Sequence, residues 1–403
     1  MSWAISDLKN PVQFEKLFEE SGEIGEGTDG TVTVYTHRHT AEFIAVKTPR
    51  YDLSSSNHEE SIIREIRNLA ILGRHEHISS MLTFTQNFRF DQGPAIFFQL
   101  CDLGDLDHYV YKWKRRETTH GRPERLLEIT ILKLLRDVGL GLDYLHNGLT
   151  KSYVHVDLKP ANILVLTPPG FADPGDAIPA LPTFKITDFA RLIIYPLHPA
   201  KSLSFWPGTY LYSPPPAERT RAGFTPAVDM WSLGAAIQHI ALGIKPRQSR
   251  AAFIVSRKRK GQKYPTLDED LSKWPWRDVI PTVYRPLDTT CAELREKWDV
   301  QGHLPHHQPY SKRLNTWYKA LMERDPRERL TAAQLQRYVV PLIETQLKIE
   351  EKIALAREKF VEAKELREGV LVRKFMYEVR PDARLSNVAK KPKYDGEDYG
   401  GSI

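Results

Sequence analysis

One acid, one base and one amide stand within eight residues in the stretch HVDLKPAN, residues 155–162. The carboxylate of Asp157 can accept a proton from a hydroxyl, and the ammonium of Lys159 can hold a phosphate group. The side-chain carbonyl of Asn162 can ligate a hard metal ion. A helical pattern precedes these residues and the apolar run ILVL follows them, so we expect a loop between a helix and a strand, where chemistry is often located.

The composition is that of an ordinary globular chain of 403 residues, with 41% hydrophobic and 27% charged residues. A net charge of +6 is mild for this length and does not by itself indicate nucleic-acid binding, so no nucleic acid is expected as a partner. The basic run RKRK at residues 257–260 is interpreted as a solvated loop, with a nuclear-import or acidic-partner patch as the alternative.

Cysteine content and hydropathy indicate in which cellular compartment the protein is expected. The only cysteines are Cys101 and Cys291, so we expect neither a disulfide framework nor a Cys-based zinc site, and a reducing environment fits. Residues 1–9 lack the apolar stretch of a signal peptide, and no apolar run approaches a membrane span. We therefore expect a cytoplasmic or nuclear protein with no membrane partner.

Three glycines, Gly25, Gly27 and Gly30, form a G-x-G-x-x-G pattern. The pattern alone is weak, because it also suits a dinucleotide-binding fold or an ordinary Gly-rich hairpin. Here the next residues, TVTVYT at 31–36, are β-branched and alternate, which predicts a strand rather than a helix. In a glycine turn between strands, backbone N–H groups can approach phosphates because no Cβ intervenes. Asp29 stands at the tip of this turn, where a carboxylate would not favour phosphate binding.

Two charged residues stand in apolar surroundings that favour their pairing. The strand FIAVK predicted at residues 43–47 ends in Lys47, and a lysine at the inner end of an apolar strand needs an acidic partner or a phosphate. Residues 58–72 are predicted to form a helix in which Glu65 is flanked by an apolar stripe. Taken alone, each residue would be a solvated surface charge; their place among the other motifs favours a pair.

In their order along the chain these motifs resemble those of the protein kinase family. Residues 155–162 resemble its catalytic loop H-R-D-x-x-x-x-N, with Val156 in place of Arg, and residues 43–47 resemble its V-A-I-K strand. The glycine turn resembles the loop that covers the nucleotide phosphates. The further matches are DFA at 188–190 in place of D-F-G, GTYLYSPPPAE at 208–218, DMWSLG at 229–234, and a D-P-x-x-R motif that ends at Arg329.

The resemblance covers about residues 18–340 and implies an α+β, bilobal protein-kinase fold at residues 17–340. Its small β-rich N-lobe would span about residues 17–100, and its larger, mostly helical C-lobe about residues 101–340, after an N-terminal flank at residues 1–16. A C-terminal helix is predicted at residues 341–379, and its apolar strip could pack on the kinase body, pair with a partner helix, or both. The tail at residues 380–403 is polar, which predicts disorder.

The resemblance also implies roles for individual residues. The expected catalytic residues are Asp157, Lys159, Lys47 and Glu65, with Asp157 as the base. The expected cofactors are ATP and Mg²⁺, the metal being held by Asn162 and Asp188. The expected ATP-binding residues are Gly25, Gly27, Gly30, Val32, Ala45, Lys47, Gln99 and Cys101. The expected structural residues are His155, Phe189, Thr209, Glu218, Asp229 and Arg329.

The function implied is that of a serine/threonine protein kinase, because Lys159 in the DLKPAN form and Thr209 resemble that class. The partner would be a protein substrate with a Ser or Thr acceptor. By the resemblance, residues 191–218 form the activation segment. Valine at position 156 cannot bind a phosphate on that segment, so phosphorylation of Ser202, Ser204 or Thr209 is not expected to be needed to order it.

The alternative function is a pseudokinase scaffold, which binds nucleotide or partners without efficient phosphoryl transfer. The departures at Asp29, Val156 and Ala190 and in the PPPAE segment motivate it. Against it, every residue expected to touch metal, phosphate or the acceptor proton is present. A small-molecule phosphotransferase on the same fold fits poorly, because the segments at 208–218 and 229–234 are protein-kinase features.

Overall fold

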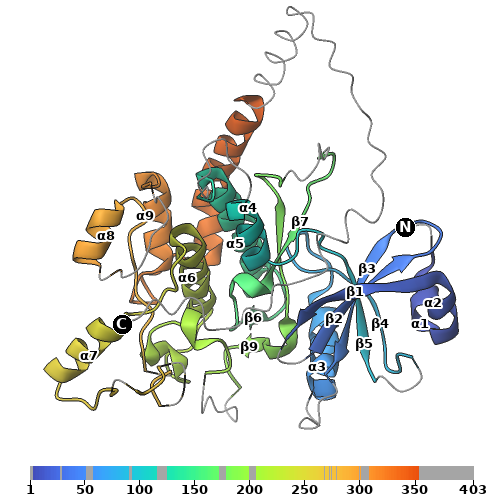
Figure 1. Cartoon of the computed structure of the whole chain (residues 1–403), viewed down its shortest axis with the longest axis horizontal. Coiled ribbons are helices and arrows are strands. Elements are labelled where there is room, and N and C mark those ends of the chain that lie inside the picture. Colours follow the sequence, from blue (N-terminus) through green and yellow to red (C-terminus); the bar gives the residue numbers. More distant parts are fainter. Residues whose placement is uncertain are drawn as a thin grey trace, which may run out of the picture.

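The structure is a computed structural model of the chain. It describes residues 3–353 apart from residues 28–29, 51–57, 90–92, 116–124, 172–177, 199–205, 267, 272, 274, 278, 299 and 301–307. Asp29, Ser202, Ser204, the predicted tail and all but the start of the predicted C-terminal helix therefore lie outside the described residues. A part built on a β-sheet is followed by a larger, mostly helical part (Figure 1).

The first part is a five-stranded antiparallel sheet with the strand order β1-β2-β3-β5-β4. The strands are β1 (Phe18–Glu26), β2 (Gly30–His37), β3 (Phe43–Pro49), β4 (Met81–Thr85) and β5 (Ala95–Gln99). The glycine turn joins β1 to β2, and the Gly27 N–H donates a hydrogen bond to the Gly30 carbonyl. The turn is therefore part of a hairpin, as the β-branched residues after it predicted.

The predicted flank at residues 1–16 contains helix α1 (Ile5–Lys9) and all of helix α2 (Pro11–Leu17) except its last residue. The side chain of Asn10 caps α2 by accepting hydrogen bonds from the backbone of residues 12 and 13, and proline follows at the first helical position. Phe14 is fully buried, with its ring centroid 5.0 Å from those of Phe18 and Tyr35. Burying such a ring contributes roughly 2 kcal/mol, so these helices help to stabilise the sheet.

Helix α3 (His58–Leu72) has the bounds predicted from its apolar spacing and packs against β3 and β5. Its apolar stripe is buried at Ile62, Ile66 and Leu69. Glu65 lies on the same buried side and is only 1% exposed, so its carboxylate requires a partner inside the protein.

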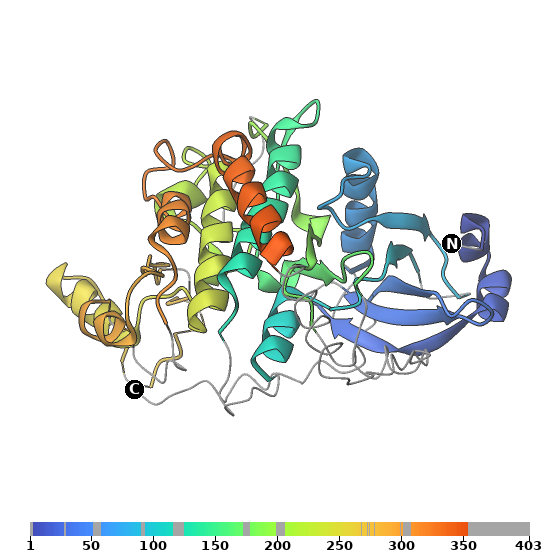
Figure 2. The same ribbon diagram turned by 90° about the horizontal axis from the view of Figure 1, so that it is seen from above.

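The helical part surrounds two central helices. Its helices are α4 (Leu106–Arg115), α5 (Glu128–Asn147), α6 (Ala227–Leu242), α7 (Arg250–Arg259), α8 (Cys291–Lys297), α9 (Lys312–Leu321) and α10 (Ala332–Gln334). Helices α5 and α6 contact each other and bury residues such as Leu135, Leu142 and Leu233 completely. After α10 the chain continues through the π-helical turn η5 (Leu335–Val339) and stays helical to residue 353, beside α5 (Figure 2).

Short elements carry the segments that matter for chemistry. Two strand pairs form, β6 (Ser152–Val154) with β9 (Ile193–Tyr195) and β7 (Ile163–Leu166) with β8 (Thr183–Ile186). The 3-10 turns are η1 (Pro160–Asn162), η2 (Phe189–Arg191), η3 (Tyr210–Tyr212) and η4 (Pro216–Arg219).

The predicted architecture, a small β-rich part before a larger helical part, is confirmed. Among the described residues, no helix is both long and apolar enough to cross a membrane.

Candidate active site

Residues 155–162 lie between β6 and β7, and a buried carboxylate on α6 holds their backbone. Asp229 is 0% exposed and accepts hydrogen bonds from the N–H of His155 at 2.8 Å and of Val156 at 2.9 Å. His146 Nε2 lies 3.0 Å from the same carboxylate. Val156 has a φ of +65°, which a β-branched residue rarely adopts and which costs on the order of 1–3 kcal/mol. The two backbone hydrogen bonds to Asp229 maintain this conformation.

The carboxylate of Asp157 meets two cations and one backbone N–H. Its Oδ2 lies 3.3 Å from Lys159 Nζ and 3.2 Å from Arg191 Nη1, and its Oδ1 accepts from Thr209 N at 2.7 Å. Lys159 also donates to Thr209 Oγ1 at 3.1 Å. A Cβ on Gly208 would stand 2.1 Å from the Val156 carbonyl oxygen, so only glycine lets this segment approach the loop so closely.

Lys47 joins three elements. Its Nζ lies 2.6 Å from Glu65 Oε2 on α3 and 3.4 Å from Asp188 Oδ1 after β8. Burial alone would lower the pKa of Lys47, but the carboxylates of Asp188 and Glu65 outweigh burial and raise that pKa above its ordinary value. Burial likewise acts to raise the pKa of Asp188, and Lys47 with further cations nearby holds it below its ordinary value. Lys47 and Asp188 are therefore charged at neutral pH.

The DFA segment is fixed from two sides. The Phe189 N–H donates to Glu65 Oε1 at 3.3 Å, and its carbonyl accepts from Asn68 Nδ2 at 2.6 Å. The His155 ring donates from Nε2 to the Thr187 carbonyl at 2.9 Å and meets the buried Phe189 ring edge-on at 5.3 Å. Helix α3 and the loop at 155–162 thus position Asp188, the residue between Thr187 and Phe189.

Oxygen donors suited to a hard metal ion come from adjacent segments. The carboxylate of Asp188 is 26% exposed. Asn162 donates from Nδ2 to the Asp157 carbonyl at 2.8 Å, which leaves its Oδ1 as the acceptor atom. The Thr187 N–H donates to the Asn162 carbonyl at 3.0 Å and ties the two segments together. A carboxylate and an amide oxygen fit the ligand preference of Mg²⁺, which usually shares such sites with phosphates.

The residues expected to bind ATP lie on β1, β2, β3 and β5, at Gly27 between β1 and β2, and just after β5. Val32 pairs with Lys47, and Ala45 pairs with Phe98, across the sheet. A Cβ on Gly25 would meet no atom of the described residues within 4 Å, whereas a Cβ on Gly30 would come within 2.5 Å of the Thr48 carbonyl oxygen. Packing of the sheet therefore already requires Gly30, while Gly25 leaves open space.

The two residues expected at the end of this region differ in exposure. Gln99 is the exposed last residue of β5, and Cys101 is buried. Burial raises the pKa of the Cys101 thiol to about 12, so this cysteine is a packed thiol and not a nucleophile.

Glu218 and Arg329, expected as a distant pair, form two parallel hydrogen bonds of 2.7 and 2.8 Å. Their side chains are 4% and 0% exposed. Arg329 also donates from Nη1 to the Ala227 carbonyl at 2.8 Å and from Nε to the Glu323 carbonyl at 2.9 Å, so four of its five N–H donors have acceptors.

Three polar residues of the site were missed by the sequence analysis: Asn68, His146 and Arg191. Each of them contacts an expected site residue: Asn68 donates to the Phe189 carbonyl, His146 contacts Asp229, and Arg191 contacts Asp157. No spacing rule points to Asn68 or His146. The one available signal for Arg191 is its position directly after DFA in the chain.

A family model described as "Protein kinase domain" matches residues 18–339 of the chain. The chain therefore belongs to the protein kinase family. The predicted family and bilobal fold are confirmed.

Two similar proteins are named "Serine/threonine-protein kinase ATG1". That of Gibberella zeae is 26% identical over 294 residues, which cover 66% of this chain and 29% of that protein. That of Colletotrichum lindemuthianum is 26% identical over 292 residues, which cover 65% and 40%. "Inhibitor of nuclear factor kappa-B kinase subunit alpha" of Gallus gallus is 25% identical over 326 residues, which cover 77% and 36%. The matched part thus makes up less than half the length of these curated relatives.

Proposed function

We propose that this protein is an ATP-dependent serine/threonine protein kinase that transfers the γ-phosphoryl group of Mg-ATP to a protein hydroxyl. The observation that carries the proposal is the position of Lys47 Nζ, 2.6 Å from Glu65 and 3.4 Å from Asp188. Strand β3, helix α3 and the segment after β8 are thereby assembled around one cation that can contact the ATP phosphates.

In this proposal the chain's residues act mainly by positioning and electrostatics. Asp157 orients the acceptor hydroxyl and takes its proton as the new O–P bond forms and the bond from the γ-phosphorus to ADP breaks. Lys159, 3.3 Å from Asp157, neutralises charge on the transferred phosphoryl group. Asp188 and Asn162 would hold Mg²⁺, which neutralises charge on the phosphates when bound.

We also propose that activation-segment phosphorylation is not needed for activity. Val156, which replaces the arginine that grips a phosphate in other kinases, is 1% exposed. It belongs to an apolar cluster with Ile193 and Trp206 of the activation segment and with Val154, Phe224 and Val228. Packing of this cluster holds the activation segment against the loop at residues 155–162. In a kinase with arginine at this position, an ionic contact to a phosphate does this instead.

A pair of variants tests this second proposal. Joint substitution of Ser202→Ala and Ser204→Ala should leave the rate of substrate phosphorylation within about twofold of wild type, because no phosphate is needed. Trp206→Ala should lower that rate about tenfold by opening the apolar cluster. A serine double variant with less than about a tenth of wild-type activity would contradict the proposal.

The pseudokinase scaffold remains the second candidate function, and one contact favours it. Arg191 Nη1 lies 3.2 Å from the Asp157 carboxylate, the group that must accept the acceptor's proton. A substrate hydroxyl has to share this carboxylate with Arg191 or displace it, which would slow transfer.

Intact mass after incubation with Mg²⁺ and ATP distinguishes the two functions. A kinase that modifies itself gains about 80 Da for each phosphate. Wild type and the exposed-site control Asp268→Asn should gain mass and Asp157→Asn should not. If wild type binds nucleotide but transfers no phosphate to itself or to a mixed Ser/Thr peptide library, the scaffold function is favoured.

A further inference from the structure

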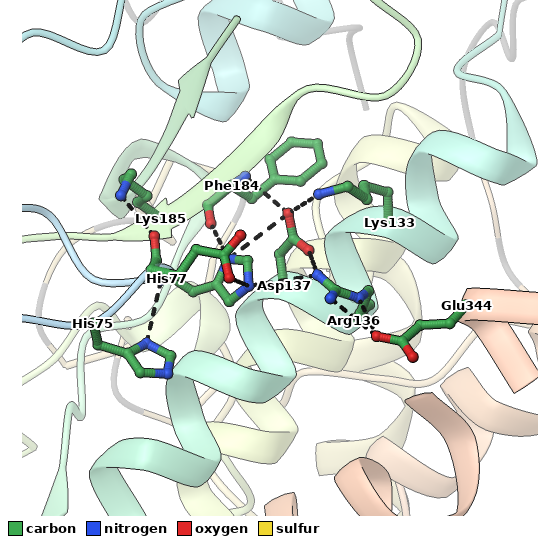
Figure 3. Close-up of polar contacts among 9 residues, drawn as sticks. His75, His77, Lys133, Arg136, Asp137, Phe184, Lys185 and Glu344 are labelled. Carbon is green, nitrogen blue, oxygen red and sulfur yellow. Dashed lines mark hydrogen bonds and ion pairs between the residues drawn. The ribbon is translucent and has the colours of Figure 1, made fainter. Parts of the chain in front are cut away.

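A buried charged cluster lies on α5, outside the candidate active site (Figure 3). The side chain of Asp137 is 0% exposed, and two cations from its own helix neutralise it. Lys133 Nζ contacts Asp137 Oδ2, and Arg136 Nη1 donates to Asp137 Oδ1 at 2.8 Å. A carboxylate buried this deeply needs such partners, and the identity of its further contacts suggests what it does.

Asp137 connects α5 to the strand that leads into the DFA segment. Its Oδ2 accepts a hydrogen bond from the Phe184 N–H on β8 at 3.1 Å. The Phe184 carbonyl accepts from His77 Nδ1 at 3.1 Å, and the Ile186 N–H donates to the His77 carbonyl at 2.9 Å. Strand β8 ends at Ile186, two residues before Asp188.

The same contacts reach the segment that follows α3, the helix that carries Glu65. Burial lowers the pKa of His77, so its ring is neutral at pH 7. The neutral ring donates from Nδ1 to Phe184, and Nε2 lies 3.5 Å from Arg136 Nη1. Next to it, His75 stacks on the ring of Tyr144 of α5 at 4.5 Å. The segment after α3 is therefore attached to both α5 and β8.

The helix after η5 joins this cluster from the far end of the sequence. Glu344 Oε1 accepts hydrogen bonds from Arg136 Nε at 3.1 Å and Nη2 at 3.0 Å (Figure 3). On the inner side of this helix Ile343 is 0% and Leu347 is 8% exposed, so apolar packing supports the ion pair. The side chain of Glu344 itself is 40% exposed and can be replaced without leaving a buried cavity.

We infer that Asp137 is a positioning residue for the phosphoryl-transfer site, and that Glu344 makes the helix at residues 340–353 part of the same unit. Asp137 fixes β8 relative to the segment after α3. Because β8 leads to Asp188 and α3 carries Glu65, Asp137 thereby sets the relative position of these two residues. Glu344 orients Arg136 against Asp137 and His77. The inference rests on the proposed function for its kinetic consequences, and its structural part does not depend on activity.

Hydrogen exchange with kinetics tests the inference in the full-length protein. Glu344→Gln should speed backbone exchange in peptides that cover residues 75–80 and 183–188, and should lower kcat about threefold with the KM for the acceptor unchanged. Glu351→Gln, an exposed glutamate on the same helix, is the matched control and should change neither. Asp137→Asn should speed exchange in the same peptides more strongly, at protein concentrations where circular dichroism shows it folded.

The inference would be overturned if both peptides exchanged at the wild-type rate in Glu344→Gln. The same result in folded Asp137→Asn would also overturn it. If Asp137→Asn does not fold, the comparison of Glu344→Gln with Glu351→Gln decides alone. Wild type without any transferase activity would defeat the proposed function, but the exchange comparison would still decide whether Asp137 and Glu344 hold these segments together.

Discussion

Two buried ion arrangements in this molecule use the same chemistry to different ends. Arg329 and Glu218 are 0% and 4% exposed and form a buried pair joined by two hydrogen bonds, here called the closed pair. Lys47 instead shares two carboxylates, Glu65 and Asp188, and Asp188 remains 26% exposed. The closed pair joins η4 to the segment after α9. In the open arrangement one lysine faces two carboxylates, which agrees with the metal-binding role proposed for Asp188.

The largest effect is expected from Asp188→Asn. We expect phosphoryl transfer to fall about a thousandfold, because the substitution removes the charged ligand proposed for the metal. The melting temperature should change little, because Lys47 keeps Glu65 as its partner at 2.6 Å. Steady-state kinetics and thermal unfolding of the same preparation check both parts. A variant with full activity would contradict the role assigned to Asp188.

The matched change in the closed pair, Glu218→Gln, should lower stability and leave activity nearly unchanged. It leaves the buried Arg329 without an opposite charge, which costs about 3 kcal/mol of the free energy of unfolding. Activity per folded molecule should stay close to wild type below the melting transition. Glu19→Gln, in an exposed pair with Arg38 at 2.9 Å, serves as the control and should leave the melting temperature unchanged. Unaltered urea stability in Glu218→Gln would remove the distinction between the two arrangements.

A smaller effect is expected from the buried His239, which faces two lysines and no carboxylate among the described residues. Burial, together with Lys114 and Lys245, lowers the pKa of His239 from 6.5 to about 4. Between these values the unfolded chain binds a proton that the folded chain does not, so stability falls as pH falls. At pH 5 this difference amounts to about 2 kcal/mol relative to pH 7.

Urea unfolding at pH 7 and pH 5 measures this dependence. His239→Gln should flatten it, because the titrating group is gone, whereas the exposed-site control His39→Gln should keep it. His77, whose pKa burial also lowers, contributes in the same direction in all three proteins. Equal slopes in His239→Gln and wild type would show that His239 does not titrate as its burial requires.

Local patterns in the sequence predicted much of the fold. The β-branched run after the glycine turn predicted β2, and apolar spacing predicted α3 with the bounds that the structure shows. The helices at residues 5–17 were not predicted, because they are short and their apolar residues become meaningful only when packed on the sheet.

Part of the candidate site was likewise predicted from the sequence, and part was not. The order of motifs singled out Lys47, Glu65 and Asp188, and the structure brings them together. Their roles stay predictions. Contacts between residues far apart in sequence, such as Arg136 with Glu344, leave no local pattern and could not be foreseen. The same holds for the apolar packing of Val156, which the sequence showed only as a missing arginine.

The most direct test of phosphoryl transfer through Asp157 is a single-turnover measurement on wild type and Asp157→Asn, with Mg-ATP affinity determined on the same samples. We predict unchanged affinity, because Asp157 serves the acceptor hydroxyl, and a transfer rate lower by about a thousandfold, the range for loss of a general base. Equal transfer rates in the two proteins, or a wild type that binds Mg-ATP and transfers nothing, would contradict the account.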